Sequence, residues 1–430
     1  MSDSFATMRD RLVRVVDDVA DEIVAFTADL IRIPTINPPG EHYEACARLI
    51  GEKLEGFEFD VEYAVADDRP EHSTAYPRVN VVGRRQGAAA RPAVHLNGHV
   101  DVVPVGDGWT RDPFGGDVVD GRIYGRGACD MKAGIAAALF AAEAFRRADI
   151  PLAGTIELSA TVDEESGGWA GVAHLARRGR ISHRDLDYVI IPEPLNVDRI
   201  CVGHRGVYWF EVTTHGHIAH GSMPFLGVSA IEHMGEVLHA VRDELLPALA
   251  RRTTAMPVVP DGARHATLNV NALTGGQAGS PIQSPCVAHE CVATFDRRFL
   301  KEEGFEAAKA EIETLLARVA ARVPHMRYDL RDLMVVHPVE TPPRSPLTAT
   351  LETAIRDILG RDAALVASPG TYDHKHVARI GGIEHCVAYG PGILELAHQP
   401  DEWCGVDDLV DATKVLALAL FDLVGMPRRP

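Results

Sequence analysis

The sequence predicts an α/β fold, in which a mostly parallel β-sheet flanked by helices carries an inserted α+β domain. Three observations predict it. Short apolar segments alternate with helical ones over about the first 200 residues, as in a parallel sheet. The pattern becomes antiparallel near Val207, and the α/β alternation resumes near Arg327. We therefore expect a main domain in two parts, residues 1–206 and 327–430, around an inserted domain of residues 207–326.

The first part of the main domain begins with a long amphipathic helix from Phe5 to Ile33, which stops at Pro34. The segments that follow have the lengths and turn residues of an alternating α/β chain. They are a helix at 41–54, strands at 61–65, 79–82 and 93–101, a hairpin at 116–125, a helix at 131–148, a strand at 156–162, a helix at 169–178 and a strand at 188–192.

The inserted domain has a βαββα-like order. Its predicted elements are a strand at 207–214, a helix at 228–249, strands at 266–273 and 286–295, and a helix at 302–322. The main domain then resumes with a strand, a helix at 346–359, a glycine-rich turn, a strand at 384–387 and a last helix at 406–424.

Composition and charge exclude several classes of protein. The chain has 430 residues, 46% of them hydrophobic and 24% charged, which is typical of a globular protein with a sizeable core. A net charge of −18 disfavours partners such as nucleic acids or anionic membranes. Charged residues run through the first thirty positions, and the seven cysteines contain no C-x-x-C pair. We expect a cytoplasmic protein with reduced thiols.

Residues that could bind metal follow the ends of several apolar segments. His99 ends one of them, and Asp101 lies two positions on, on the same face of a strand. Asp130 opens the alanine-rich helix, where a carboxylate could also serve as a helix cap. The other candidates are Glu164 with Glu165, Glu193, and His398. Because strand ends meet at one edge of a parallel sheet, we expect these residues to form a ligand set for two divalent ions.

Five motifs resemble those of the co-catalytic metallopeptidase family that includes acetylornithine deacetylase, succinyl-diaminopimelate desuccinylase, aminoacylase and glutamate carboxypeptidase. They are GHVDVVP at 98–104, YGRGACDMKAG at 124–134, TVDEESGG at 161–168, IPEP at 191–194 and LAHQPDEW at 396–403, and they occur in the family's order. The resemblance implies that His99, Asp130 and Glu193 bind one metal ion. It also implies that Asp130, Glu165 and His398 bind the other, with Asp130 as the bridge. Such ligands suit zinc, cobalt or manganese.

The same resemblance implies roles for three further residues. Asp101 would orient His99, and Glu164 would be the general base that accepts a proton from water and returns it to the leaving nitrogen. His220 matches a histidine that, in relatives, reaches the active site of a neighbouring subunit, so we expect a homodimer formed through the inserted domain. The nearby His215 and His217 are simply explained as polar residues at a strand end.

Two stretches bear on the substrate. Asp296-Arg297-Arg298 resembles a family element whose arginine binds a substrate carboxylate, which would be Arg298. Arg297 is expected to be a solvated strand charge, and Asn269 matches a position near the substrate. The loop from Ser368 to His376 departs from the G-G-T-D/S-A type of its relatives. Gly370, Thr371 and Tyr372 are candidate substrate contacts, and the following Asp-His-Lys-His forms either a solvated helix start or a pocket wall for an anionic or aromatic group.

Three functions remain open at this point. The first is a dinuclear metal-dependent hydrolase that cleaves a C–N bond in a small carboxylate-bearing substrate, of the N-acyl amino acid deacylase or carboxypeptidase type. The second is a hydrolytic deaminase that removes an amino group from an aromatic acid, which the Tyr372–His376 departure motivates. The third is a metal-free binding or scaffold protein, which we would expect to have lost a ligand or Glu164.

Overall fold

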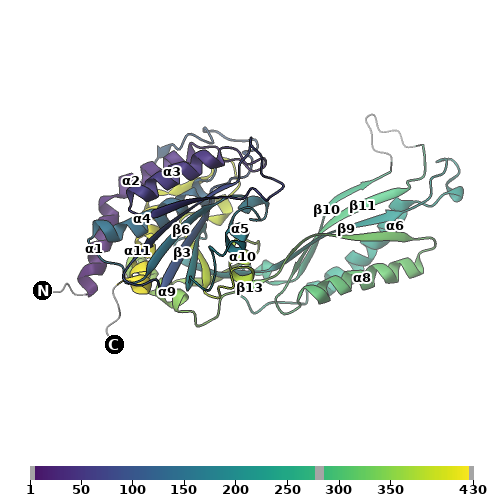
Figure 1. The fold of residues 1–430 in the computed structure, drawn as a ribbon. Coiled ribbons are helices and arrows are strands. Elements are labelled where there is room, and N and C mark those ends of the chain that lie inside the picture. Colours follow the sequence, from purple (N-terminus) through teal and green to yellow (C-terminus); the bar gives the residue numbers. More distant parts are fainter. Residues whose placement is uncertain (1–4, 277–284, 426–430) are drawn as a thin grey trace. The chain divides into compact units, whose positions relative to one another are not determined.

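The computed structural model describes residues 5–276 and 285–425, and the chain forms two compact units (Figure 1). The first unit comprises Met1–Val202, Thr341–Val366 and Tyr372–Pro430. The second comprises Gly203–Glu340 and the short segment Ala367–Thr371.

The first unit is built on one large sheet. Its strand order is β1 (Asp60–Val65), β2 (Val79–Gln86), β6 (Thr155–Thr161), β3 (Ala93–His99), β7 (Tyr188–Pro194), β15 (Cys386–Gly390) and β8 (Arg199–His204). The four central strands β6, β3, β7 and β15 are parallel, and the flanking pairs are antiparallel. β14 (Ala364–Ser368) pairs with β8, and a small sheet consists of β16 (Trp403–Gly405), β5 (Arg122–Tyr124) and β4 (Val118–Val119). The predicted α/β class is confirmed.

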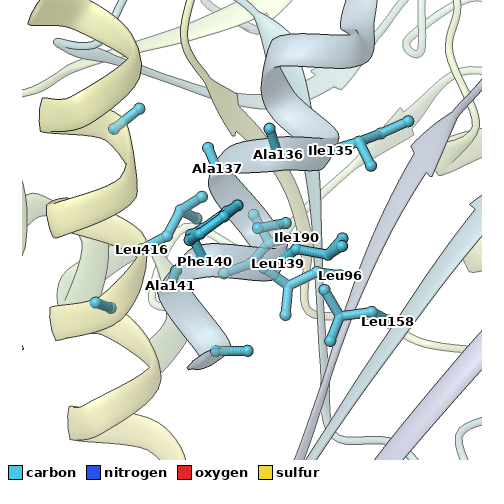
Figure 2. Close-up of a cluster of buried hydrophobic side chains, with 14 of the residues drawn as sticks. Leu96, Ile135, Ala136, Ala137, Leu139, Phe140, Ala141, Leu158, Ile190 and Leu416 are labelled. Carbon is cyan, nitrogen blue, oxygen red and sulfur yellow. The ribbon is translucent and has the colours of Figure 1, made fainter. Parts of the chain in front are cut away.

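Helices cover the sheet. They are α1 (Phe5–Asp18), α2 (Ala20–Ile31), α3 (Tyr43–Gly56), α4 (Ala133–Arg147), α5 (Val172–Arg177), α9 (Pro346–Leu359), α10 (His374–Arg379) and α11 (Val406–Val424). Figure 2 shows α4 between the sheet and α11, with Leu139 close to Leu96 and Ile190. The alanines of α4 present little bulk, which lets this helix pack closely on both sides. α5 packs against α10, and α10 packs against β15.

The second unit contains an antiparallel sheet in the order β10 (Thr267–Gly275), β11 (Glu290–Phe299), β9 (Gly206–His215) and β12 (Arg327–Val336). The helices α6 (Ala230–Ala240), α7 (Leu246–Leu249) and α8 (Phe305–Arg322) share one apolar core with it. Phe210 stacks on Phe295 with 4.9 Å between ring centroids. β13 (Val339–Glu340) pairs with the last residues of β8.

Two features differ from the sequence-based expectation. The strand after Arg327 was expected to start the returning main domain, but β12 pairs with β9, so the second unit extends to Glu340. Its partner strand lies more than a hundred positions earlier, and no local pattern reveals that pairing. The predicted helix from Phe5 to Ile33 is divided at Val19, where the backbone leaves helical geometry (φ −107°, ψ 12°).

Candidate metal and catalytic site

The predicted ligands come together at one edge of the sheet in the first unit. His99 is the last residue of β3, and Glu193 lies near the end of the adjacent β7. Glu165 follows β6 in a single turn, Glu164–Ser166, and Asp130 lies just before α4. His398 follows the turn Leu394–Leu396. Because β6, β3 and β7 are parallel neighbours, their carboxyl ends deliver these side chains to the same place.

The distances divide the ligands into two groups that share Asp130. His99 Nε2 lies 3.0 Å from Asp130 Oδ1 and 3.9 Å from Glu193 Oε1. His398 Nε2 lies 3.4 Å from Asp130 Oδ2 and 3.1 Å from Glu165 Oε1. The two oxygens of Asp130 therefore face different histidines, which is the arrangement expected of a carboxylate that bridges two ions. Ligand atoms of His99, Asp130 and Glu165 all lie within 4.8 Å of one another.

The electrostatics of this cluster favour bound cations. Burial, together with the charge of Asp130, raises the pKa of Glu193 well above its ordinary value. Burial also raises the pKa of Glu165 to about 7. Carboxylates crowded in a buried site are unfavourable unless positive charge compensates them. Two histidine nitrogens with three carboxylates make a mixed donor set that fits a pair of divalent transition ions.

Neighbouring carboxylates raise the pKa of both histidines and so favour their protonated forms. Burial alone would raise the pKa of Asp130, but hydrogen bonds with His398 and His99 keep it well below its ordinary value. Hydrogen bonds with Asp130 and Glu165 raise the pKa of His398 to about 10. Burial lowers the pKa of His99, yet its contacts with Asp130 and the charge of Glu193 raise it overall. The protonated imidazole rings thus supply positive charge that bound cations would otherwise supply.

Asp101 contacts more than His99. Its carboxylate oxygen Oδ1 lies 3.6 Å from His99 Nδ1, while its own backbone carbonyl is closer, at 2.9 Å. The two carboxylate oxygens accept the backbone N–H groups of Glu164 and Glu165, each at 3.1 Å, and the side-chain amide of Asn37 at 2.9 Å. Asp101 therefore links the histidine strand to the turn that carries the predicted base.

The same turn is anchored from a second direction by Asp163, which has a left-handed backbone (φ 62°). The buried Asp163 carboxylate accepts hydrogen bonds from the Tyr43 hydroxyl at 2.8 Å and from Arg78 Nε at 3.0 Å. A strained turn fixed by buried polar contacts places Glu164 with little freedom. Tyr43 and Arg78 were not identified from the sequence, since neither is adjacent to a motif.

A third anchor holds the segment before Asp130. One oxygen of the buried Glu402 accepts the backbone N–H groups of Gly127, Cys129 and Asp130 at 3.1, 2.8 and 3.1 Å. Glu402 lies inside the LAHQPDEW motif, and its role was not predicted from the sequence. Its position four residues after the candidate ligand His398 was the signal that could have found it.

The Tyr372–His376 stretch leads into α10 and forms its first turn, and the solvated-helix interpretation is wrong. His374, Lys375 and His376 are only 1%, 5% and 5% exposed. Tyr372 is buried, and its hydroxyl contacts the carbonyl oxygen of Cys201 at 3.4 Å. Lys375 Nζ lies 3.2 Å from Glu164 Oε1. The polar groups of this stretch are therefore turned inward, and one of them reaches the predicted base.

The remaining candidates lie in the second unit. Arg298 makes a two-point ion pair with Asp296, at 2.7 and 2.9 Å. Asn269 is the register partner of Asp296 on the neighbouring strand, so the two residues share a face of the sheet. His220 Nδ1 lies 2.7 Å from Ser222 Oγ. Gly370 and Thr371 belong to the short segment Ala367–Thr371 that joins this unit.

Two arginines of the second unit differ from the expectation. Arg297 was expected to be solvated, but it is fully buried and pairs with Glu303 at 2.6 Å. Arg205 was not predicted at all. It is buried and donates to the carbonyl oxygens of His265 at 3.0 Å and Pro369 at 3.2 Å, directly before Gly370. Arg205 thus supports the loop of the candidate substrate contacts.

Comparison with known proteins agrees with this geometry. The model of the family described as Peptidase family M20/M25/M40 matches residues 95–422. The chain is 29% identical over 409 residues to succinyl-diaminopimelate desuccinylase of Rhodospirillum centenum, covering 94% of this chain and 97% of that protein. The enzyme of the same name from Methylobacterium nodulans is 31% identical over 415 residues, covering 92% and 95%.

A solved structure shares the fold. Human carnosine dipeptidase 1 superposes with a TM-score of 0.75 at 18% identity, covering 96% of this chain and 98% of that one. Within residues 5–276 and 285–425, none of the helices combines the length and apolar character needed to cross a membrane.

Proposed function

Because the chain belongs to peptidase family M20/M25/M40 and is a metal-dependent hydrolase of C–N bonds, we propose that it cleaves the amide bond of a small N-acyl amino acid or dipeptide. The observation that carries this proposal is the placement of Asp130, whose two oxygens face two separate histidine–carboxylate pairs. Relatives named succinyl-diaminopimelate desuccinylase support an N-acyl substrate.

The residues of the site have distinct roles in this proposal. His99, Asp130 and Glu193 hold one ion, and Asp130, Glu165 and His398 hold the other, with zinc as the proposed metal and cobalt or manganese as alternatives. Two divalent cations, when bound, lower the pKa of a water molecule and polarise the scissile carbonyl group. Glu164 accepts the proton of that water and delivers it to the leaving nitrogen. Asp101 keeps Glu164 in place through the backbone of its turn.

The proposed substrate carries a carboxylate. Arg298 is the candidate for binding it, because a guanidinium offers paired donors to a carboxylate and Asp296 already holds this side chain in one orientation. Asn269, Gly370 and Thr371 are proposed further contacts.

A hydrolytic deaminase acting on an aromatic acid is the second candidate. The buried segment that leads into α10 favours it, because Tyr372 would supply an aromatic side chain and Lys375 would supply a cation beside the base. A metal-free scaffold protein is disfavoured by the intact ligand cluster and base.

We also propose a homodimer formed through the second unit. Phe225 and Leu226 there are 79% and 59% exposed, and β10 is an edge strand of its sheet with mostly exposed residues. Exposed apolar side chains and a free strand edge favour association. In such a dimer His220 would act in the partner's site. In the described part of the chain, residues 5–276 and 285–425, the seven cysteines form no disulfide, which supports the proposed cytoplasmic location.

One experiment distinguishes the candidates. The purified protein is loaded with zinc, cobalt or manganese and incubated with N-acyl amino acids, dipeptides and amino-aromatic acids. Release of an amine and a carboxylic acid in equal amounts is expected. Ammonia without an acid fragment identifies the deaminase instead. A chain that retains no divalent metal and turns over none of these compounds would be the scaffold protein.

A further inference from the structure

The start of α10 packs against the turn that carries Glu164. Lys375 Nζ donates to Glu164 Oε1 at 3.2 Å. The His376 ring donates through Nε2 to the backbone carbonyl of Gly167 at 2.7 Å. The same ring lies against Trp169, with 4.9 Å between centroids. The contacts of α10 thus bracket the turn on both sides of Glu165.

The start of α10 packs tightly against the end of this turn, at Gly168. Gly168 has a left-handed backbone (φ +75°), and a Cβ atom there would lie 2.4 Å from Asp373 Oδ1 and 3.1 Å from the His376 ring. Asp373 and His376 therefore lie directly over the main chain of the turn. This close approach requires glycine at position 168.

A buried polar network anchors α10. Asp373 Oδ2 accepts from the Asn97 amide at 3.3 Å, and Asn97 Oδ1 accepts from Ser159 at 2.7 Å. His95 joins the network between Ser159 at 2.7 Å and Glu157 at 2.8 Å. These residues alternate along β3 and β6, on the face that also carries His99. The helix bearing Lys375 is therefore tied to the two strands that deliver ligands.

The ammonium of Lys375 is dedicated to the base. Its side chain is 6% exposed, and within residues 5–276 and 285–425 its one side-chain hydrogen bond is to Glu164. Burial lowers the pKa of Lys375, but the charges of Glu164 and Asp373 raise it overall, so the group stays protonated. Glu164 lies beside several other carboxylates, which repel it, and a fixed cation counteracts that repulsion.

We propose that Lys375 is a positioning residue, which holds Glu164 Oε1 and thereby presents the other carboxylate oxygen for proton transfer. This inference rests on the proposed role of Glu164 as the general base. It does not depend on whether the scissile bond is an amide or an aromatic C–N bond, since both need a base in a fixed place.

The test compares Lys375→Met, which keeps the length of the side chain without its charge, with Lys375→Arg, which keeps the charge. We expect the Met variant to lose about 100-fold in kcat, the size of effect that misplacing a catalytic group produces, with KM nearly unchanged. The Arg variant should recover at least about tenfold of that loss. Metal content per chain should equal that of the wild type in both. Lys414→Met, which removes a partly buried lysine on α11, is the control.

A substitution cycle separates positioning from general stabilisation. In a Glu164→Gln background, Lys375→Met should change the residual kcat by less than about threefold, because Lys375 acts through Glu164. If the loss in kcat of the double variant equalled the product of the two single-variant losses, the proposal would be overturned. A rise in KM at constant kcat for Lys375→Met would also overturn it, because it would make Lys375 a substrate contact. If the Met variant does not fold, Lys375→Gln replaces it, since Gln keeps a donor without the charge. The proposed substrate class is tested separately, by the products that the substrate screen releases.

Discussion

Glu402 and Arg126 form an ion pair in the interior of the first unit, with 2.5 Å between Oε2 and Nη1 and neither side chain more than 2% exposed. The other oxygen of Glu402 caps the backbone that leads to Asp130. The pair thus connects the loop after His398 to the segment that carries Asp130, the proposed bridging carboxylate.

Loss of this pair should destabilise the fold. Removing one partner of a buried ion pair leaves an uncompensated charge and costs about 3–5 kcal/mol. We expect Glu402→Gln to lower the free energy of unfolding by this amount, measured by urea denaturation of the metal-free protein. Glu395→Gln, on an exposed residue of the same loop, should change it by less than about 0.5 kcal/mol. Equal stability of the two variants would contradict the proposed anchoring role.

Glu164→Gln should abolish proton transfer while leaving the ligand set intact. The expected loss in kcat is about 10²–10⁴-fold, the usual contribution of a general base. Metal content, measured by elemental analysis after dialysis, should stay at the wild-type value because Glu164 is not a proposed ligand. Glu55→Gln, on an exposed helix position, is the matched control. Full turnover by a metal-loaded Glu164→Gln protein would overturn the mechanism.

Metal binding should release protons. In the metal-free protein the pKa of His398 is raised to about 10 by its hydrogen bonds with Asp130 and Glu165, and burial raises the pKa of Glu165 to about 7. Both groups must be deprotonated to bind a cation. At pH 7, His398 is protonated and Glu165 is partly so. Affinity should therefore rise as pH increases from 6 to 9.

Calorimetry can measure this release. Titration of the metal into protein in buffers of different ionisation enthalpy should give more than about one proton released per chain near pH 7. His398→Ala should release fewer protons as well as bind more weakly. An affinity that does not change with pH would contradict the raised pKa of His398.

Arg298→Met should weaken recognition of the substrate carboxylate. A hydrogen bond to a charged group contributes about 1.5–3 kcal/mol, so kcat/KM should fall by about tenfold to a hundredfold. With a substrate whose carboxylate is replaced by a carboxamide, Arg298→Met should lower kcat/KM only slightly, because the contact with the carboxylate is already lost. Arg327→Met, on an exposed position of β12, should behave as wild type. If Arg298→Met lowered kcat/KM equally for the carboxylate and the carboxamide substrate, Arg298 would have a role in the stability of the fold and not in binding the carboxylate.

Several local features could be predicted from the sequence. The bounds of α9 and α11 match the predicted helices 346–359 and 406–424, because Pro at the start of one and Gly before and after the other mark their ends. The ligand candidates were identifiable because each follows the end of an apolar segment. In a parallel sheet that position brings His99, Glu165 and Glu193 together, whereas Asp130 and His398 come from a segment before α4 and from a loop.

Other contacts depended on the tertiary structure. Lys375 and Glu164 are 211 positions apart, and Glu402 and Arg126 are 276 apart. The charges at 374–376 were compatible with a solvated helix start, and the packing of α10 against α5, β15 and the turn after β6 buries them. Likewise, β12 joined the second unit through a non-local pairing.

The sequence by itself determined the order of strands and helices, the candidate metal ligands and the candidate base, since these depend on residues close together in the chain. The tertiary structure decided what holds them in place. Asp101, Glu402 and Lys375 act on the site through hydrogen bonds made across the fold. Such contacts form because distant segments pack against one another, and the local sequence pattern carries no record of which side chains then meet.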